Sequence, residues 1–413
     1  MMKETKMKRV PKLRFPEFTD DWEQRKLGYT IPVVTDYVAA GSFADIAANV
    51  DYKSEPDYAQ LVRTVDLKHN FENNDSVYVD KNAFDYLYRV NLDEESIVLP
   101  NIGANIGEVY YIEPSELPYE RNVLGPNAIY LKPNKNTKFI YSLFQTVDFQ
   151  KKLAISVASS GQPKFNKTEL KEILLMLPNN DEQRAIGSYF RNLDNLITLH
   201  QRKLEKLKEL RKGVMKKLFS QEVRFKADDG SEFPDWEEKK LGDDVQFING
   251  RAYKQDELLN SGKYLVLRVG NLFTNDSYYY SDLELDNDKY IENGDLIYAW
   301  SATFGPRIYY GEKCIYHYHI WKLKFDENII SKIFLNYYLL YDVEKIKSQR
   351  TGGTMVHITK NAMEHRELQF PCLAEQQKIA DCLSTLDDVI EKQKATLAAW
   401  EELKKGLLQQ MFV

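Results

Sequence analysis

The sequence predicts an α+β protein in which two mixed α/β domains are separated by two long helices that form an antiparallel coiled coil. First, the two halves of the chain share a series of residues in the same order. Second, each repeat closes on a long stretch whose apolar residues recur every three or four positions. Third, the regions between are rich in Tyr, Val, Ile and Phe, in short runs broken by Gly, Asn, Asp and Pro.

The composition is that of a globular protein with roughly two to three domains. The chain has 413 residues, of which 43% are hydrophobic and 29% charged. No run approaches the roughly 20 apolar residues of a membrane span, and the charged N-terminus is unlike a signal peptide. The three cysteines form no Cys-x-x-Cys pair, so we expect neither disulfides nor a zinc site, and a reducing cytoplasm as the location.

The net charge of −6 counts against a simple nucleic-acid binder, because proteins that bind phosphates are usually basic. A total charge is not a map of the surface, however. Acidic helices elsewhere in the chain can mask a basic groove. The charge therefore weakens the case for nucleic-acid binding without excluding it.

The repeat is most evident at the start and the end of each half. Trp22 matches Trp236, and each is followed by Glu and then by Leu-Gly. Residues 177–219 align with residues 370–412 without a gap, and they share a Pro, a Glu-Gln, a Leu-Asp and a Lys-Gly. Similar composition alone would not place these residues in one gap-free order, so the repeat is genuine.

The closing segments are predicted to be long helices with a coiled-coil seam. In the first copy the seam positions are Phe190, Leu193, Ile197, His200, Leu204, Leu207, Arg211, Val214 and Leu218. In the second copy they are Leu383, Leu386, Ile390, Gln393, Leu397, Trp400, Lys404, Leu407 and Met411. Neither helix can bury its own stripe, so the copies are expected to pair with each other, most simply antiparallel. The alternative is that each helix packs on its own globular domain.

The regions between the repeats are predicted to be α/β domains with a twisted or barrel-like sheet. Residues 128–131 and the alternating run 314–323 have strand patterns, whereas residues 141–153 and 329–346 have helical patterns. The predicted division is an N-terminal segment (1–27), a first domain (28–176), a central helix (177–220), a linker with the start of the second repeat (221–241), a second domain (242–369) and a C-terminal helix (370–413).

This layout resembles the specificity subunit of type I restriction–modification enzymes over essentially the whole chain. The most specific features are the Phe-x-x-x-Trp-Glu-x-x-x-Leu-Gly of residues 18–28 and the Glu-Gln pairs at 182–183 and 375–376. The loop 294–301 and the Gly-Gly-Thr of 352–354 are further typical elements.

The first half departs from this pattern at two places. Residues 101–107 stand where the second half has its Trp-Ser loop, and residues 159–162 replace the Gly-Gly-Thr. Such differences suit two domains that read different bases. The resemblance implies that each domain is a target-recognition domain that reads one half of a bipartite, asymmetric target in double-stranded DNA.

The resemblance also implies a set of partners. The helices would set the spacing between the half-sites and dock two methyltransferase subunits, which carry S-adenosylmethionine and methylate adenine. A further restriction subunit, a motor and nuclease that uses ATP and Mg, would cleave unmodified DNA. This chain would supply specificity and assembly, so we expect it to hold no cofactor or metal, to be no enzyme and to have no membrane partner.

Candidate DNA-contacting residues are polar or basic side chains on predicted loops, because Arg pairs with guanine, Asn and Gln pair with adenine, and cations bind phosphates. In the first half they are Asn101, Asn105, Gln162, Lys164, Asn166 and Lys167. In the second half they are Arg251, Lys254, Ser301, Thr303, Arg307, Thr354, His357, Thr359 and Lys360. For each of them the alternative is a loop residue that is merely solvated.

Five other residues that could meet DNA receive a different interpretation. Trp300 is predicted to belong to the core, and His317 and His319 to alternate on a strand and face solvent. Arg63 and Arg268 recur at matching places in domains that read different sequences. Such recurrence suits phosphate contact or a structural role better than base readout.

Catalytic interpretations are disfavoured. The sequence has neither the Gly-rich loop and Pro-Pro motif of a methyltransferase nor the P-loop of an ATP motor. Residues 234–239 superficially resemble a metal-nuclease pattern, but their acidic groups are too close in the sequence to come from two adjacent strands. The alternative to a DNA reader is a non-catalytic coiled-coil adaptor or scaffold with two protein-binding domains, and salt dependence of DNA binding separates the two.

Overall fold

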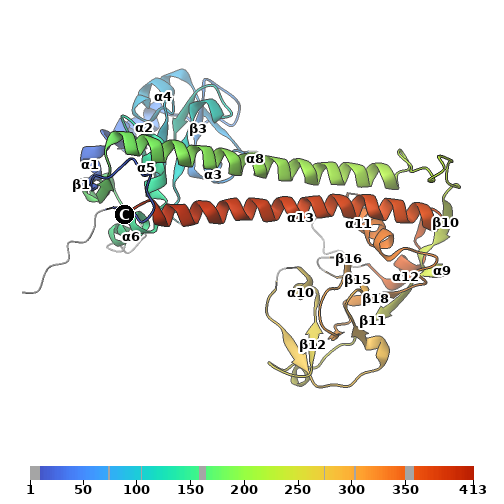
Figure 1. Ribbon diagram of the computed structural model, residues 1–413. Helices are drawn as coiled ribbons and strands as arrows, with labels where there is room; N and C mark the ends of the chain where they lie inside the picture. The colour runs from blue at the N-terminus through green and yellow to red at the C-terminus, as the bar shows by residue number, and fades with distance from the viewer. Residues whose placement is uncertain are drawn as a thin grey trace, which may run out of the picture. The chain divides into compact units, whose positions relative to one another are not determined.

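The computed structural model describes residues 10–72, 75–103, 105–157, 164–273, 275–301, 304–348 and 358–413. The chain divides into two compact units, Met1–Gln201 with Ala395–Val413, and Arg202–Lys394. Each unit holds one α/β domain and a part of each long helix (Figure 1).

The domain of the first unit has two small sheets. Their strands are β2 (Val33–Asp36), β3 (Ala59–Val62), β4 (Val77–Val79), β5 (Ser96–Pro100), β6 (Tyr110–Ile112), β7 (Asn122–Leu124) and β8 (Ala128–Lys132). One sheet is antiparallel in the order β2-β8-β5-β6. In the other, β3 lies between its antiparallel neighbour β4 and its parallel neighbour β7. The strand predicted at residues 128–131 is confirmed as β8.

Short helices connect these strands and cover the sheets. They are α1 (Leu27–Thr30), η1 (Tyr37–Ala40), α2 (Phe43–Asn49), α3 (Thr64–Lys68), α4 (Lys81–Tyr86), η2 (Tyr88–Val90), η3 (Pro114–Glu116), α5 (Thr137–Phe144), α6 (Val147–Val157) and α7 (Lys167–Glu172). The helical pattern predicted over 141–153 is confirmed except at residues 145 and 146, where α5 ends at Phe144 and α6 begins at Val147. The Thr146 hydroxyl accepts a hydrogen bond from the backbone N–H of Phe149 (3.3 Å), which starts a new helix.

The domain of the second unit has the same strand order with a different sequence. Its strands are β11 (Gln246–Asn249), β12 (Tyr264–Leu267), β13 (Tyr279–Ser281), β14 (Tyr290–Ile291), β15 (Leu296–Ala299), β16 (Gly305–Ile308), β17 (Cys314–Tyr316) and β18 (Ile320–Lys324). The order β11-β18-β15-β16 reproduces the first sheet, and β13-β12-β17 reproduces the second, including its one parallel pair. The repeat therefore extends through the variable regions as a shared topology.

The helices of this second domain are fewer. They are α9 (Leu241–Asp244), η4 (Gln255–Glu257), α10 (Val269–Phe273), η5 (Asn287–Lys289), α11 (Lys332–Ser348) and α12 (Lys360–Glu364). The helix predicted over 329–346 is confirmed as α11. The single strand predicted over 314–323 is wrong, because β17 belongs to one sheet and β18 to the other. Between them His317 forms an isolated bridge with Arg251, and Tyr318 and His319 form a turn.

A two-stranded ladder closes each domain where the chain enters and leaves it. The strands are β1 (Glu23–Lys26) with β9 (Leu174–Leu177), and β10 (Glu237–Lys240) with β19 (Glu367–Phe370). The repeated Leu-Gly follows each entry strand. A Cβ on Gly28 would lie 2.9 Å from Cβ of Lys171, and one on Gly242 would lie 2.8 Å from Cβ of Glu364. Glycine recurs there because α1 and α9 approach α7 and α12 closely.

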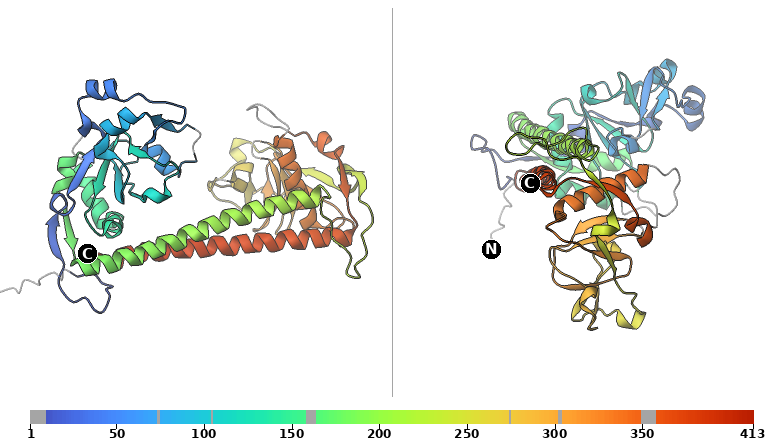
Figure 2. Two further views of the ribbon diagram at one scale, coloured as in Figure 1. Left: turned by 90° about the horizontal axis from the view of Figure 1, so that it is seen from above. Right: turned by 90° about the vertical axis from the view of Figure 1, so that its right-hand side faces the viewer.

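The two long helices are α8 (Asn180–Phe219) and α13 (Leu373–Gln410), of 40 and 38 residues. Figure 2 also shows them side by side. In the first unit Lys404 pairs with Asp194 (2.9 Å), and Gln201, further along α8, donates to Glu401 (3.5 Å). Residue numbers rise on one helix as they fall on the other, so the pairing is antiparallel, as predicted.

The ends of the helices complete the domain cores. In the first unit Trp22 contacts Phe139 and Phe412, and Phe190 also packs against Phe412. In the second unit Phe219 stacks on Tyr338 with ring centroids 4.9 Å apart. The alternative of helices packed on domains thus holds for the ends of the helices, in addition to the coiled coil.

Candidate nucleic-acid interface

Two loops contact each other in each domain. One follows β5 in the first domain or β15 in the second, and the other precedes the last short helix, α7 or α12. In the first domain Asn101 donates its backbone N–H to Asn127 O (3.1 Å), and its own carbonyl accepts from Phe165 (3.2 Å). In the second domain Trp300 bonds to His319 O (3.1 Å) and accepts from Ile358 (3.4 Å). Pairing across the sheets therefore brings together, within each domain, two of the loops predicted to contact DNA.

The candidates Asn101, Asn105 and Lys164 lie at this junction in the first domain. The Asn101 amide donates to the carbonyl of Phe165 (3.1 Å), which holds the two segments together. The Asn105 side chain accepts from Lys68 Nζ (2.7 Å), which also pairs with Glu108 (3.0 Å). Lys164 is exposed and forms a backbone bridge with Ile102. Lys68 is a cation at this loop that the sequence patterns did not single out.

In each domain two candidates lie at the start of the last short helix, which is α7 in the first domain and α12 in the second. Asn166 and Thr359 are the N-cap residues of α7 and α12, and each accepts hydrogen bonds from backbone N–H groups of its helix. The neighbouring lysines are also engaged: Lys167 Nζ lies 2.8 Å from Asp36, and Lys360 Nζ lies 3.6 Å from Glu364. These side chains have a structural role, and a role in DNA contact stays a prediction.

The other described candidates of the second domain differ in whether their side chains are exposed and free of ion pairs, as contact with DNA would require. Arg251 forms a bidentate pair with Glu257 (2.7 and 3.0 Å), and Lys254 is exposed. Ser301 is buried. Arg307 donates to the carbonyl of Leu272 and lies over the Phe273 ring. Gln162, Thr303, Thr354 and His357 lie outside the described residues.

Trp300 lies at the edge of the core rather than within it. Its ring stacks on Trp321 with centroids 5.9 Å apart, and its Nε1 donates to the carbonyl of Tyr318 (2.8 Å). Because the side chain is half-buried, the core assignment holds only for one side of the ring.

His317 and His319 were predicted to alternate on a strand, and this prediction is wrong. His317 forms an isolated bridge with Arg251 directly after β17, and His319 lies in the turn before β18. Their rings are 4.9 Å apart, and both residues are half-buried. The His319 ring also lies 4.8 Å from that of Trp300. The Tyr/His alternation in the sequence gave no sign of this turn, because the crossover between two sheets depends on pairing with β12 and β11, which are distant in the chain.

The recurring arginines have different partners in the two domains. Arg63 pairs with Asp66, a buried carboxylate 2.7 Å away, and with Asp75. Asn271 stands at the place of Asp66, and Arg268 donates instead to the carbonyl of Ser277 (3.0 Å) and lies over the Tyr279 ring. The Arg268 Nε is buried and has no hydrogen-bond partner among the described residues. The structural interpretation therefore fits Arg63 better than Arg268.

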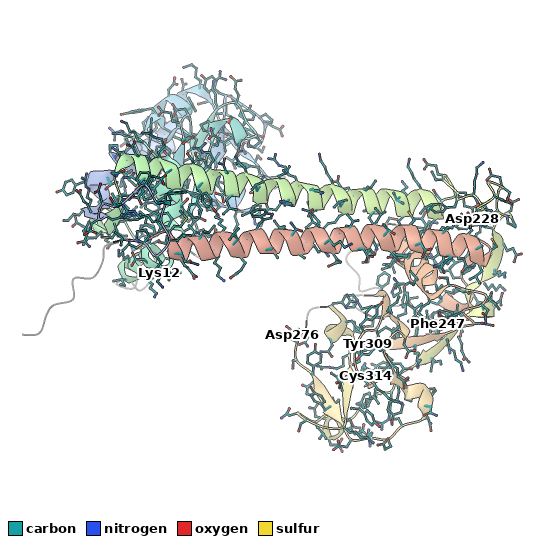
Figure 3. All side chains as sticks on the ribbon, viewed as in Figure 1. Lys12, Asp228, Phe247, Asp276, Tyr309 and Cys314 are labelled. Carbon is teal, nitrogen blue, oxygen red and sulfur yellow. The ribbon has the colours of Figure 1, made fainter. Side chains whose placement is uncertain are left out.

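Two titratable side chains of the second domain, Cys314 and His317, have shifted pKa values. Cys314 lies in the domain interior near Tyr309 (Figure 3), and burial raises the pKa of its thiol to about 11. Burial, then the positive charges of His319 and Arg268, lower the pKa of His317 to about 4.

Among the residues with described positions, no group of three or more His, Cys, Asp or Glu could hold a metal ion. In the same part of the chain no helix has the length and apolarity to cross a membrane.

The comparisons with known proteins agree with this geometry. The family model described as "Type I restriction modification DNA specificity domain" matches residues 20–209 and 234–399. The type I restriction enzyme MjaVIII specificity subunit of Methanocaldococcus jannaschii is 25% identical over 428 residues, covering 98% of this chain and 95% of the relative.

Two solved structures share the fold. One comes from work on complex assembly and conformational transition of the type I R-M system. Its TM-score is 0.58, its sequence identity is 14%, and the match covers 95% of this chain and 97% of that chain. The other is the S subunit of a type I restriction–modification system from M. genitalium, with a TM-score of 0.54, 16% identity and coverage of 98% and 99%. With two matched segments that span most of its length, the chain belongs to the family of type I restriction–modification DNA specificity subunits, the non-catalytic members of these systems.

Proposed function

We propose that this chain reads a bipartite, asymmetric target in double-stranded DNA, with one half-site for each target-recognition domain. The supporting observation is that the two domains share one strand order while matched loops carry different side chains. Asn101 and Trp300 follow equivalent strands, and Asn127 and His319 accept the same backbone hydrogen bond. Because base readout depends on side-chain chemistry at groove edges, equivalent frames with different loops suit two different half-sites. The domains that we assign to this role extend over 28–176 and 242–369.

The long helices are proposed to set the spacing between the half-sites and to dock two methyltransferase subunits. Exposed apolar side chains on the helices support docking, and they recur with the internal repeat. Leu196 and Leu403 are exposed in the first unit, and Val389 and Leu210 occupy the matching positions in the second. Two equivalent apolar sites suit two copies of one partner.

The chemistry is proposed to lie on those partners. S-adenosylmethionine would bind the methyltransferase subunits, and ATP and Mg would bind a restriction and translocation subunit. This chain would contribute specificity and assembly and would act in the cytoplasm.

Methylome sequencing tests the proposal. A bacterial host free of adenine methylation would express this chain together with a type I methyltransferase subunit. A new methyladenine motif with two different specified halves and an unspecified spacer is the expected result. A stable co-purified complex that yields no motif, and a chain whose DNA binding does not respond to salt, would contradict the proposal and favour the adaptor.

A further inference from the structure

We propose that the exposed side of α8 around Leu210 is a docking surface for carboxylate side chains of a protein partner, so that the two methyltransferase sites differ in charge. The inference rests on the proposed function, because it assumes that one methyltransferase subunit docks at Leu210 and a second copy docks at the matching Leu403. It adds the chemistry of the partner's surface and makes only one of the two sites depend strongly on salt.

The second half of α8 is strongly basic. Residues 202–217 hold eight Lys or Arg residues and two Glu residues, in a chain whose net charge is −6. Glu205 pairs with Lys208 (2.7 Å), which leaves Glu209 as the other carboxylate of this stretch. Among the described residues, the ion pairs of the stretch also engage Arg211 and Lys217. The exposed cations outside these pairs are Arg202, Lys203, Lys206, Lys212 and Lys216.

The spacing of most of these cations places them around an exposed leucine. Lys203, Lys206, Leu210 and Lys217 recur at steps of three, four and seven residues, so they lie along one side of the helix. Leu210 itself is 52% exposed. We call this surface the basic patch, and its cations are Arg202, Lys203, Lys206, Lys216 and Lys217.

The internal repeat supplies a neutral counterpart on α13. Leu210 recurs as the exposed Leu403, and Gly213 recurs as Gly406. Every cation of the basic patch is replaced there by an exposed, uncharged residue, and these residues are Ala395, Thr396, Ala399, Gln409 and Gln410. We call the surface around Leu403 the neutral patch. Because it belongs to an equally long helix, the cations of the basic patch are not required for the helix to form.

The helix itself gives no reason for three of these cations. Cations in the last turn of a helix are stabilised by its dipole, which accounts for Lys216 and Lys217. Arg202, Lys203 and Lys206 lie more than three turns before the end of α8, where the dipole has little effect. Arg202 and Lys206 are four residues apart, a spacing at which like charges repel. Negative charge from outside the chain would remove this repulsion.

The basic patch fits a protein better than DNA. Leu210 is apolar, and a phosphate backbone offers no apolar surface to cover it. Protein interfaces combine an apolar centre with a polar rim, in which opposite charges speed association and select the partner. Two copies of one partner would present the same carboxylates to both patches, and these carboxylates would form ion pairs at the basic patch alone.

Salt dependence of stepwise assembly tests this inference. The full chain is titrated with the methyltransferase subunit that co-purifies with it, and native mass spectrometry counts complexes with one and with two subunits. Between roughly 50 and roughly 300 mM ammonium acetate, the first binding step of the wild-type chain should weaken by about three- to tenfold, because a few exposed ion pairs are screened. The second step should weaken by less than about twofold.

Exchange of charges between the two patches provides the variants. Arg202→Ala with Lys206→Ala should reduce the salt dependence of the first step to that of the second. The reverse exchange, Ala395→Arg with Ala399→Lys, should make both steps depend on salt. All four positions are exposed on helices, and the residues introduced are good helix formers, so the fold should be retained.

The matched control is Lys394→Ala with Lys405→Ala. Both lysines are exposed on α13, outside the two patches, and each pairs with a glutamate of its own helix. This variant removes the same charge as Arg202→Ala with Lys206→Ala and should keep the wild-type salt dependence of both steps.

Thermal melting identifies any variant that does not fold, and the other exchange then decides. A salt dependence that neither exchange alters overturns the basic patch and leaves the two docking sites of the proposed function standing. If Arg202→Ala with Lys206→Ala instead lowers the salt dependence of duplex binding and leaves assembly unchanged, the patch binds DNA and the inference is also overturned. A wild-type chain that binds no methyltransferase subunit overturns both the inference and the proposed docking.

Discussion

The guanidinium of Arg14 donates two hydrogen bonds, both 2.7 Å long, to the carboxylate of Glu182, which is fully buried at the start of α8. The indole of Trp22 donates to the same carboxylate (3.3 Å). The second unit repeats the arrangement with Arg224 and Glu375, and there Trp236 is the indole donor. One buried polar cluster in each unit thus explains the repeated Trp and Glu. The Gln that follows each Glu instead donates to the carbonyl of the repeated proline, Pro178 or Pro371 (2.9 Å in both units).

Removal of one partner from this cluster should destabilise the unit strongly. Arg224→Ala would leave the buried Glu375 carboxylate with only the indole donor, and loss of one partner from a buried pair costs about 3–5 kcal/mol. Urea unfolding of the full chain measures this change in the free energy of unfolding. Arg25→Ala is the control, because Arg25 and its partner Glu23 are both exposed and little change is expected. Equal effects of the two substitutions would contradict the structural role of the cluster.

The antiparallel pairing of the long helices should depend on two equivalent ion pairs. Arg211 meets Asp387 (2.6 Å) in the second unit, as Lys404 meets Asp194 in the first, and Tyr337 also donates to Asp387 (2.7 Å). Arg211→Asp should destabilise the chain by about 1–3 kcal/mol, and Asp387→Arg in the same chain should restore part of the loss. Denaturation of the single and double variants provides the measurement. Additive losses in the double variant would show that the two residues are not coupled.

The helices are expected to act as a ruler for the DNA target. Deletion of residues 198–204 from α8 and of the matching residues 391–397 from α13 removes one heptad between the two ion pairs and preserves both of them. At 1.5 Å per residue each helix shortens by about 10 Å, or about three base pairs of DNA. Methylome sequencing should show a shorter spacer between unchanged half-sites. An unchanged spacer in a folded variant would refute the ruler.

The repeated glycines should differ in their tolerance of alanine. Gly242→Ala places a Cβ 2.8 Å from the carbonyl oxygen of Glu364 and should cost about 1–3 kcal/mol of stability. A Cβ on Gly406 in α13 would meet no described atom within 4 Å outside its own stretch of helix, so Gly406→Ala should stabilise the chain by about 0.5–1 kcal/mol. Thermal melting compares the two substitutions. A neutral Gly242→Ala would argue against the close approach of α9 and α12.

Substitution of a candidate loop residue should affect one half-site only. Asn101→Ala removes the hydrogen bond to Phe165 that joins two loops of the first domain. For the Asn101→Ala variant, the binding free energy for the intact target should weaken by about 1–3 kcal/mol relative to the wild-type chain. Duplexes whose first half-site is already altered should bind the variant and the wild-type chain almost equally. Anisotropy titrations with both duplex series test this. A uniform loss across unrelated sequences would mean that Asn101 affects only backbone contact.

The net charge of −6 makes the salt dependence of binding informative. A chain that contacts about six to ten phosphates should lose a factor of about 10³–10⁵ in affinity between roughly 50 and 200 mM salt. Titrations at several salt concentrations provide the slope. A flat response would favour a protein-binding adaptor over a DNA reader.

Local periodicity was sufficient for the long helices, the internal repeat and the α+β class. The three-and-four spacing around Leu193 and Leu386 requires a buried stripe, and the antiparallel partner follows because one chain carries two such stripes. The family resemblance rested on the same repeated segments, which explains why the comparisons match both halves.

What the sequence by itself determined was therefore the part of the protein that is specified by near neighbours along the chain. The tertiary structure decided which groups meet across long separations: that Arg14 and Trp22 meet Glu182, that Asn101 bonds to Phe165, and that Tyr318 and His319 turn between two sheets. These outcomes depend on strand pairing and on buried contacts between distant residues. No periodicity of the chain encodes either, because the paired residues are distant in the sequence and their energies depend on burial.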